Sequence, residues 1–150
     1  MRSIEARAEY DVQIETLWAV LTDTAAYPEW NPFIRRVDGA LRVGERVRAH
    51  IVAPGGPGMR LRPRVTAVQA PHRLAWLGHV LVRGLFDGAH EFELTALPGG
   101  RTGLVQRETF TGVLVRPLAG TLANTRLGFE QMHEALRARL SALAGQGPAS

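Results

Sequence analysis

The amino-acid sequence contains no cysteine, no lysine and only three serines. Without cysteine the chain can form no disulfide and has no thiolate, so any metal would depend on histidine and carboxylate ligands. The serines stand at positions 3, 141 and 150, and the sequence has neither a glycine-rich phosphate loop nor a nucleophile elbow. These absences exclude catalysis by a serine or cysteine nucleophile. No two histidines have the i, i+4 spacing of a helical metal site, so we expect neither a metal nor another cofactor.

All 18 basic residues are arginine, and the formal net charge is +4. GC-rich coding produces such a bias without selection for binding. The one local concentration comprises Arg60, Arg62 and Arg64, whose period-two spacing predicts three side chains on the outer face of one strand. A solvated strand face has this pattern more often than a nucleic-acid interface does. We therefore expect no nucleic-acid partner.

Long apolar runs are also missing. The first ten residues, MRSIEARAEY, lack the continuous apolar stretch of a signal peptide, and no segment is long enough to span a bilayer. We expect a cytoplasmic protein without membrane insertion, present as a monomer or homodimer. The chain has 150 residues, of which 45% are apolar, and this combination suits one globular core. We expect a single domain over residues 1–144 and a disordered tail over 145–150.

The N-terminal third predicts one strand followed by two short helices. Residues 4–12 alternate apolar and polar side chains, which is the pattern of a strand with one buried face. From Ile14 the apolar residues recur at helical spacing, and Asp23 suits the start of a second short helix. That helix must end near Pro28, because the segment YPEWNPF contains two prolines.

The middle of the chain has the pattern of an antiparallel meander, with turn residues between short apolar runs. The expected strands are 34–38, 45–52, 60–68, 73–80, 87–96 and 102–110. The C-terminal part then changes to helical periodicity from Pro117 onward, with one apolar stripe through about seven turns. These elements together predict an α+β fold in which a long C-terminal helix covers one face of the sheet.

This order of elements resembles the START and Bet v 1-like (SRPBCC) superfamily, specifically its polyketide cyclase/dehydrase-like bacterial members. The stretches that carry the resemblance are LWAVLTDTAAYPEWNPF near the start, GAHEFEL at 88–94, RETFTG at 107–112 and the terminal helix. The resemblance implies a helix-grip fold, in which a curved antiparallel sheet of about seven strands wraps around the helix and leaves a cavity between them. Relatives include lipid-transfer modules, hormone binders, aromatase/cyclases and chaperone cofactors, so the fold does not decide the function.

The register of the last hairpin can be calculated from its turn. A three-residue loop at 98–100 makes opposed residues sum to 198, so Phe92 faces Gln106 and His90 faces Glu108 on the inner face of the sheet. A histidine and a glutamate in this position are within reach of a charge-assisted hydrogen bond. One interpretation is an acid/base pair or polar anchor in which Glu108 orients His90 and raises its basicity. The other is a buried pair that satisfies itself without a ligand.

The same parity argument assigns the remaining positions. In the preceding hairpin Val65 should face Trp76 and Ala67 should face Leu74. The expected ligand-binding residues are Trp30, Phe33, Trp76, His90, Phe92, Gln106, Glu108, Phe110, Leu118, Leu122, Thr125 and Phe129. His50 and His79 are expected on the outer surface, His72 in a turn and His133 in a structural or solvated position beside the helical stripe. The apolar run 80–86 is either the cavity entrance or additional strand.

Three functions fit this pattern. The first is the binding of a small, largely apolar ligand, such as a lipid, an isoprenoid or a polycyclic molecule, with His90 and Glu108 as its polar contact. The second is a polyketide cyclase or dehydratase that uses the same two residues as catalytic groups. The third is a protein-interaction adaptor that uses the outer face and holds no ligand.

Overall fold

The computed structural model describes residues 1–80, 82–117 and 119–146, and for residues 119–121 only the backbone. The elements follow one another as β1 (Arg2–Tyr10), α1 (Ile14–Thr22), the 3-10 turn η1 (Thr24–Ala26), α2 (Tyr27–Trp30), β2 (Ile34–Asp38), β3 (Arg48–Ile51), β4 (Met59–Leu61), β5 (Arg64–Gln69), β6 (Arg73–His79), β7 (Asp87–Leu97), β8 (Arg101–Thr111) and α3 (Ala119–Gly145). This is the expected α+β helix-grip architecture. The expected ligand wall at Leu118 and the tail at 147–150 lie outside the described residues.

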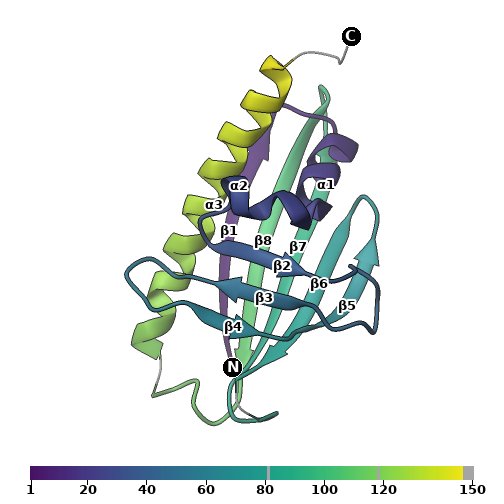
Figure 1. Ribbon diagram of the computed structural model, residues 1–150. Helices are drawn as coiled ribbons and strands as arrows, with labels where there is room; N and C mark the ends of the chain where they lie inside the picture. Colours follow the sequence, from purple (N-terminus) through teal and green to yellow (C-terminus); the bar gives the residue numbers. More distant parts are fainter. Residues whose placement is uncertain (81, 118, 147–150) are drawn as a thin grey trace.

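The strands form two antiparallel sheets. The order is β1-β8-β7-β6-β5 in the larger sheet and β2-β3-β4 in the smaller one. Figure 1 shows the smaller sheet crossing in front of the larger one, with α3, coloured green to yellow, running beside both. The loop residues 82–86 and 112–117 lie at the same end of the molecule as the N-terminus (Figure 1). In the part of the chain that the structure describes, the expected single sheet of about seven strands is eight strands in two sheets.

The predicted strand 60–68 is wrong as a single element. Pro63 lies between β4 and β5, and because proline has no N–H it cannot continue a ladder there. The chain leaves the small sheet at this point and joins the large one. Arg60 and Arg64 consequently belong to different strands, and the expected row of three arginines on one strand does not exist. The guanidinium of Arg64 instead donates to the carbonyl of Gly44 at 3.0 Å.

Two further expectations about strands need correction. The predicted strand 45–52 is shorter, because only Arg48–Ile51 forms β3. Val65 faces Trp76 as predicted, but a bulge follows Val65, so that Ala67 faces Ala75 and Leu74 faces Val68. The bulge adds one residue to β5, and every later pairing in that hairpin therefore shifts by one position.

The core lies between the two sheets, α1 and α3. Its fully buried large side chains are Tyr10, Tyr27, Phe92, Phe129, Leu17, Leu21, Ile34, Leu74, Leu94, Leu104, Met132 and Leu136. Gly128 brings α3 close to the loop before β2, since an added Cβ there would lie 2.5 Å from the ring of Phe33. That ring packs edge-on against Phe129, with 5.4 Å between the ring centroids. The absence of a side chain at Gly128 thus fixes where α3 meets the small sheet.

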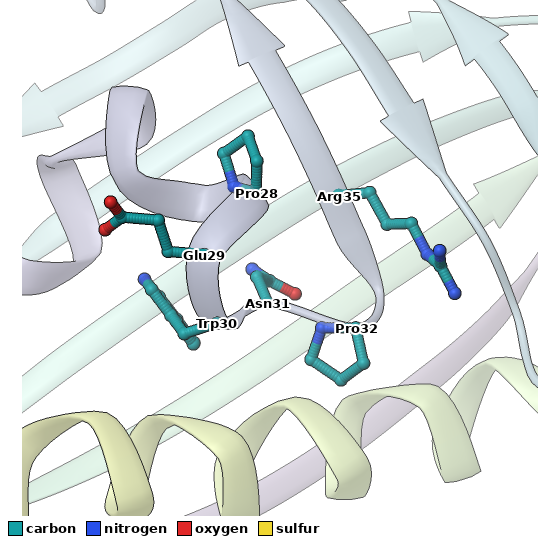
Figure 2. A pocket seen from close by; sticks show the side chains of 6 residues that line it. All are labelled: Pro28, Glu29, Trp30, Asn31, Pro32 and Arg35. Carbon is teal, nitrogen blue, oxygen red and sulfur yellow. The ribbon is translucent and has the colours of Figure 1, made fainter. Parts of the chain in front are cut away.

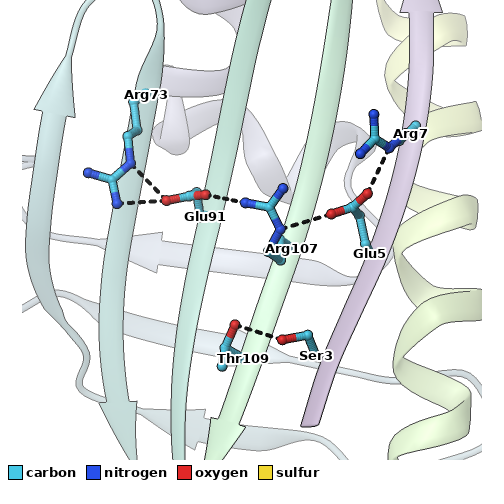
Figure 3. Close-up of polar contacts among 7 residues, drawn as sticks. All are labelled: Ser3, Glu5, Arg7, Arg73, Glu91, Arg107 and Thr109. Atoms are coloured by element: carbon cyan, nitrogen blue, oxygen red, sulfur yellow. Dashed lines mark hydrogen bonds and ion pairs between the residues drawn. The ribbon is translucent and has the colours of Figure 1, made fainter.

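The opposite face of the large sheet is polar. Figure 3 shows a row of alternating charges that runs across four strands from Arg73 to Arg7. Arg107 is at its centre, with one nitrogen 2.8 Å from Glu5 and another 2.7 Å from Glu91. Cross-strand pairs of opposite charge stabilise a sheet modestly, and they identify this face as the solvated one.

Candidate functional site

The His90–Glu108 pair forms as the sequence predicts. In the β7–β8 ladder His90 faces Glu108 and Phe92 faces Gln106. The Nδ1 atom of His90 lies 2.8 Å from Oε2 of Glu108. The two side chains differ in burial, because 1% of the histidine side chain is exposed and 15% of the glutamate side chain is. The carboxylate is therefore the member of the pair that reaches solvent.

A chain of hydrogen bonds continues from His90 into the core. The Nε2 atom of His90 lies 3.2 Å from the amide nitrogen of Gln106, and the amide oxygen of Gln106 lies 2.8 Å from Nε2 of His133. One assignment of protons satisfies all of these contacts. His133 donates to Gln106, Gln106 donates to His90, and His90 donates through Nδ1–H to Glu108. The second N–H of Gln106 points to the sulfur of Met132 at 3.6 Å.

His133 is held neutral in this network. Its pKa is lowered from 6.5 to about 4, first by burial and then by the nearby Arg137 and His90. A neutral His133 with its proton on Nε2 can donate to Gln106, and this bond fixes the orientation of the amide. The fixed amide in turn sets the tautomer of His90. His133 is therefore a structural residue, within the range of roles that the sequence predicted.

The ring of His90 is packed among three aromatic rings, and the side chain is 1% exposed. Trp76 stacks on it at 5.0 Å with an angle of 9° between the rings, and Phe92 and Phe129 approach edge-on at 4.9 and 5.5 Å. Both ring nitrogens are already engaged. In this arrangement His90 cannot accept a proton from a ligand without breaking a bond, so it acts as a support for Glu108.

One oxygen of Glu108 has no hydrogen-bond partner among the residues that the structure describes. Oε2 accepts the hydrogen bond from His90, whereas Oε1 extends over the backbone of Gly88, where an added Cβ would lie 2.5 Å away. The glycine thus makes room for the carboxylate. Phe110, next to Glu108 on the inner face of β8, is buried and contacts the ring of Phe86 at 5.3 Å between centroids. The free oxygen is therefore a hydrogen-bond acceptor beside an aromatic pair.

Two loops cover this end of the site. Backbone bonds join them from Val113 to Gly84 at 3.3 Å and from Leu114 to Leu85 at 3.0 Å. The tips of the loops are apolar and open to solvent, since Val82 is 65% exposed and Val113 is 74% exposed. The segment 80–86 is thus an irregular loop in its described residues, as the entrance interpretation requires.

Asp87 anchors the first of these loops. Its carboxylate accepts hydrogen bonds from the backbone N–H of Gly84 at 3.1 and 3.0 Å, and it lies 2.8 Å from Nδ1 of His79. The hydrogen bond from His79 lowers the pKa of Asp87. His79 and His50, expected on the outer surface, are half-buried, and His72 lies in the β5–β6 turn as predicted.

Most of the expected ligand-binding residues meet in the interior. Phe33, Trp76, His90, Phe92, Gln106, Phe110, Leu122 and Phe129 are buried there, and Thr125 is half-buried. Two hollows among the described residues, one beside α2 and one lined by residues of β5 to β8 that include Arg73, Glu91 and Arg107, both lie outside the space between the sheet and α3. Trp30 does not join this group, because it is half-buried beside Tyr27 at the edge of the core and lines a hollow next to α2 (Figure 2).

The prediction did not connect His133 and Met132 with the pair on the sheet. Both are buried on α3 and both contact Gln106. A signal was present, since His133 follows Phe129 by four positions and therefore shares its face of the helix. Within the described residues, no group of three or more histidine, aspartate or glutamate side chains could hold a metal ion. None of the described helices is long and apolar enough to cross a membrane.

Comparison with known proteins gives a family and a fold. The model of the family described as "Polyketide cyclase / dehydrase and lipid transport" matches residues 1–145. No curated protein matches the chain. Similar solved structures include a protein of Mesorhizobium loti, with 24% identity, a TM-score of 0.71 and coverage of 94% of this chain and 98% of that one.

Two other solved structures are similar over most of both chains. A hypothetical protein of Helicobacter pylori has 16% identity and a TM-score of 0.77, with 92% of this chain and 87% of that chain covered. A START superfamily protein of Mycobacterium smegmatis has 20% identity and a TM-score of 0.73, with 94% and 98% covered. At these identities the likeness shows a shared fold.

Proposed function

The chain belongs to the polyketide cyclase/dehydrase and lipid transport family, and on that premise we propose that it binds a small, largely apolar ligand that donates a hydrogen bond to Glu108. The observation that carries the proposal is the unequal burial of the pair. The side chain of His90 is 1% exposed, and both of its ring nitrogens form hydrogen bonds within the protein. The side chain of Glu108 is 15% exposed, and its Oε1 lies free beside the aromatic pair Phe86 and Phe110. A carboxylate held in this way provides one directional polar contact next to an apolar surface.

The ligand would enter between the loops 80–86 and 112–117. Two backbone hydrogen bonds, from Val113 to Gly84 and from Leu114 to Leu85, join the described residues of these loops. The side chains of Val82 and Val113 are exposed, and contact with an apolar ligand would remove their apolar surface from water. Because Phe92 and Phe129 are fully buried and pack against the ring of His90, the ligand would lie at the loop end of the site and displace the loops on entry.

The preferred ligand carries a hydroxyl or N–H group. Such a donor pairs with the free oxygen of Glu108, whereas a ligand with its own carboxylate would be repelled by it. We therefore expect neutral lipids, sterols, isoprenoid alcohols and phenolic polycycles to bind, and free fatty acids to bind more weakly. The single contact sets the orientation, and the burial of apolar area supplies most of the affinity.

The test uses N-phenyl-1-naphthylamine, a neutral apolar fluorophore with one N–H. We expect its fluorescence to rise on binding to the wild type, and Glu108→Gln to weaken binding about tenfold, because a hydrogen bond to a charged acceptor is replaced by one to a neutral acceptor. The matched control is Glu93→Gln, an exposed glutamate on the same strand as His90. Equal affinity in both variants, or no binding by the wild type, would contradict the proposal and favour an adaptor without ligand.

A cyclase or dehydratase is the second candidate, and the same free oxygen favours it. With Oε2 fixed by His90, the lone pair on Oε1 of Glu108 is placed to accept a proton from a carbon next to a carbonyl. In that case Glu108→Gln abolishes turnover of a β-keto thioester or polyketide-like compound. Turnover that survives this substitution unchanged would rule out the enzyme.

A further inference from the structure

The arginines of this chain are unevenly distributed. Residues 35–64, which cover the small sheet from β2 to β4, contain eight arginines and two acidic residues. All other residues together contain ten arginines and twelve acidic residues. The net positive charge of the protein therefore comes from this one segment, and such an asymmetry indicates an anionic partner.

The register of the small sheet gathers basic side chains on its outer face. Arg36, His50 and Arg60 face one another in a single row across β2, β3 and β4. Arg48 stands two residues before His50 and therefore points to the same side of β3. The alternate residue Ala49 is buried, so the basic row lies on the solvent side. Figure 1 looks onto this face, where the small sheet crosses in front of the large one.

The charges on this face are not neutralised within the protein. Arg48, Arg60 and Arg62 are exposed and form no ion pair with any residue that the structure describes. Arg36 alone has an acidic partner, Asp38, at 2.8 Å.

The outer face of the large sheet shows what a solvated face of this protein looks like. There the arginines of the charge row alternate with glutamates, and each of them is paired (Figure 3). Coding bias explains why the basic residues are arginine, but it does not explain why those of one sheet lack acidic neighbours. Unpaired charges of one sign repel each other, and an anionic partner removes that repulsion.

Exposed apolar side chains accompany these arginines. Met59, next to Arg60 in β4, is 42% exposed, and Val43, next to Arg42, is 61% exposed. At a lipid surface, arginines contact the anionic headgroups while apolar side chains reach the boundary of the acyl chains. A nucleic acid would leave the apolar side chains in water. A single strand would also need exposed aromatic rings for stacking, and none of the large apolar side chains exposed in the described chain is aromatic.

We propose that the outer face of β2, β3 and β4 docks on an anionic phospholipid membrane. The contact is made at the surface and needs no spanning segment. β4 is the strand of the small sheet nearest to the loop residues 82–86 and 112–117 (Figure 1). Docking would therefore hold the entrance of the candidate site close to the lipid, so that an apolar ligand passes between membrane and protein. This consequence rests on the proposed function, whereas the docking itself does not.

Co-sedimentation with vesicles tests the docking. The wild type should bind vesicles of phosphatidylglycerol mixed with phosphatidylcholine, should not bind vesicles of phosphatidylcholine alone, and should be released at high salt. The triple variant Arg48→Gln, Arg60→Gln, Arg62→Gln should weaken binding about fivefold per arginine and about a hundredfold in total.

The matched control is the triple variant Arg7→Gln, Arg101→Gln, Arg126→Gln. It removes the same charge from exposed arginines outside the small sheet, each of which has an acidic partner. The control should bind the anionic vesicles at most a few-fold more weakly than the wild type. Circular dichroism verifies that both triple variants are folded.

Three results would overturn the proposal: no binding of the wild type to the anionic vesicles, equal weakening by the two triple variants, or binding to a fluorescent DNA duplex in place of the vesicles. The last result would assign the face to nucleic acid. Glu108→Gln should bind the anionic vesicles as the wild type does, and the small-sheet variant should bind the naphthylamine probe as the wild type does. Failure of docking and failure of the proposed ligand site are thereby distinguished.

Discussion

Acidification should destabilise the protein through His133 before the carboxylates titrate. The pKa of His133 is about 4 in the folded protein and ordinarily 6.5, with burial as the main cause. Above pH 6.5 the side chain is neutral in both states. Between pH 6.5 and about 4 only the unfolded chain takes up the proton, so the free energy of unfolding falls as the pH falls. The full difference corresponds to roughly 3 kcal/mol, of which about 2 kcal/mol is lost by pH 5.

Urea unfolding of the wild type and of His133→Gln at pH 7.5 and pH 5 measures this effect. A glutamine can still donate an N–H to Gln106 but does not titrate. The wild type should therefore lose about 2 kcal/mol more than the variant between the two pH values. Carboxylates whose pKa is lowered by an ion pair, such as Glu5, lose their contribution only at lower pH. Equal losses in the wild type and the variant would refute the assignment of His133 as a buried neutral donor.

Two glycine substitutions test close contacts. Gly128→Ala should lower the free energy of unfolding by about 1–3 kcal/mol, although alanine favours a helix, because its Cβ would lie 2.5 Å from Phe33. Gly145→Ala, at the open end of the same helix, should leave the melting temperature unchanged or raise it. A larger loss of stability in Gly145→Ala than in Gly128→Ala would contradict the close packing at Gly128. Gly88→Ala should displace Glu108 and weaken binding of the naphthylamine probe without unfolding the protein, as circular dichroism would show.

The sequence predicts the β7–β8 register because the turn that fixes it is short and unambiguous. Gly99 and Gly100 have φ of 80° and 71°, which glycine adopts at little cost, so the loop length can be read directly. The β5–β6 register could not be read in the same way. No glycine or proline marks the bulge after Val65, and a bulge depends on how the strand bends over the core.

The interior pair was predictable, whereas its continuation into the core was not. His90 and Glu108 follow from parity within one hairpin, but the contact between His133 and Gln106 depends on the rotation and position of α3 relative to the sheet. Trp30 was expected to line the ligand site, and the structure instead packs it half-buried at the edge of the core beside Tyr27, with a hollow next to α2 on its other side. Burial of a loop side chain is decided by packing that local sequence does not encode.

The most direct test of ligand binding at Glu108 is native mass spectrometry of the protein purified from its own organism. The wild type should carry a bound neutral molecule of defined mass, Glu93→Gln should carry the same molecule, and Glu108→Gln should have lost most of it. A wild type without any bound molecule, or an equal bound fraction in Glu108→Gln, would contradict the account.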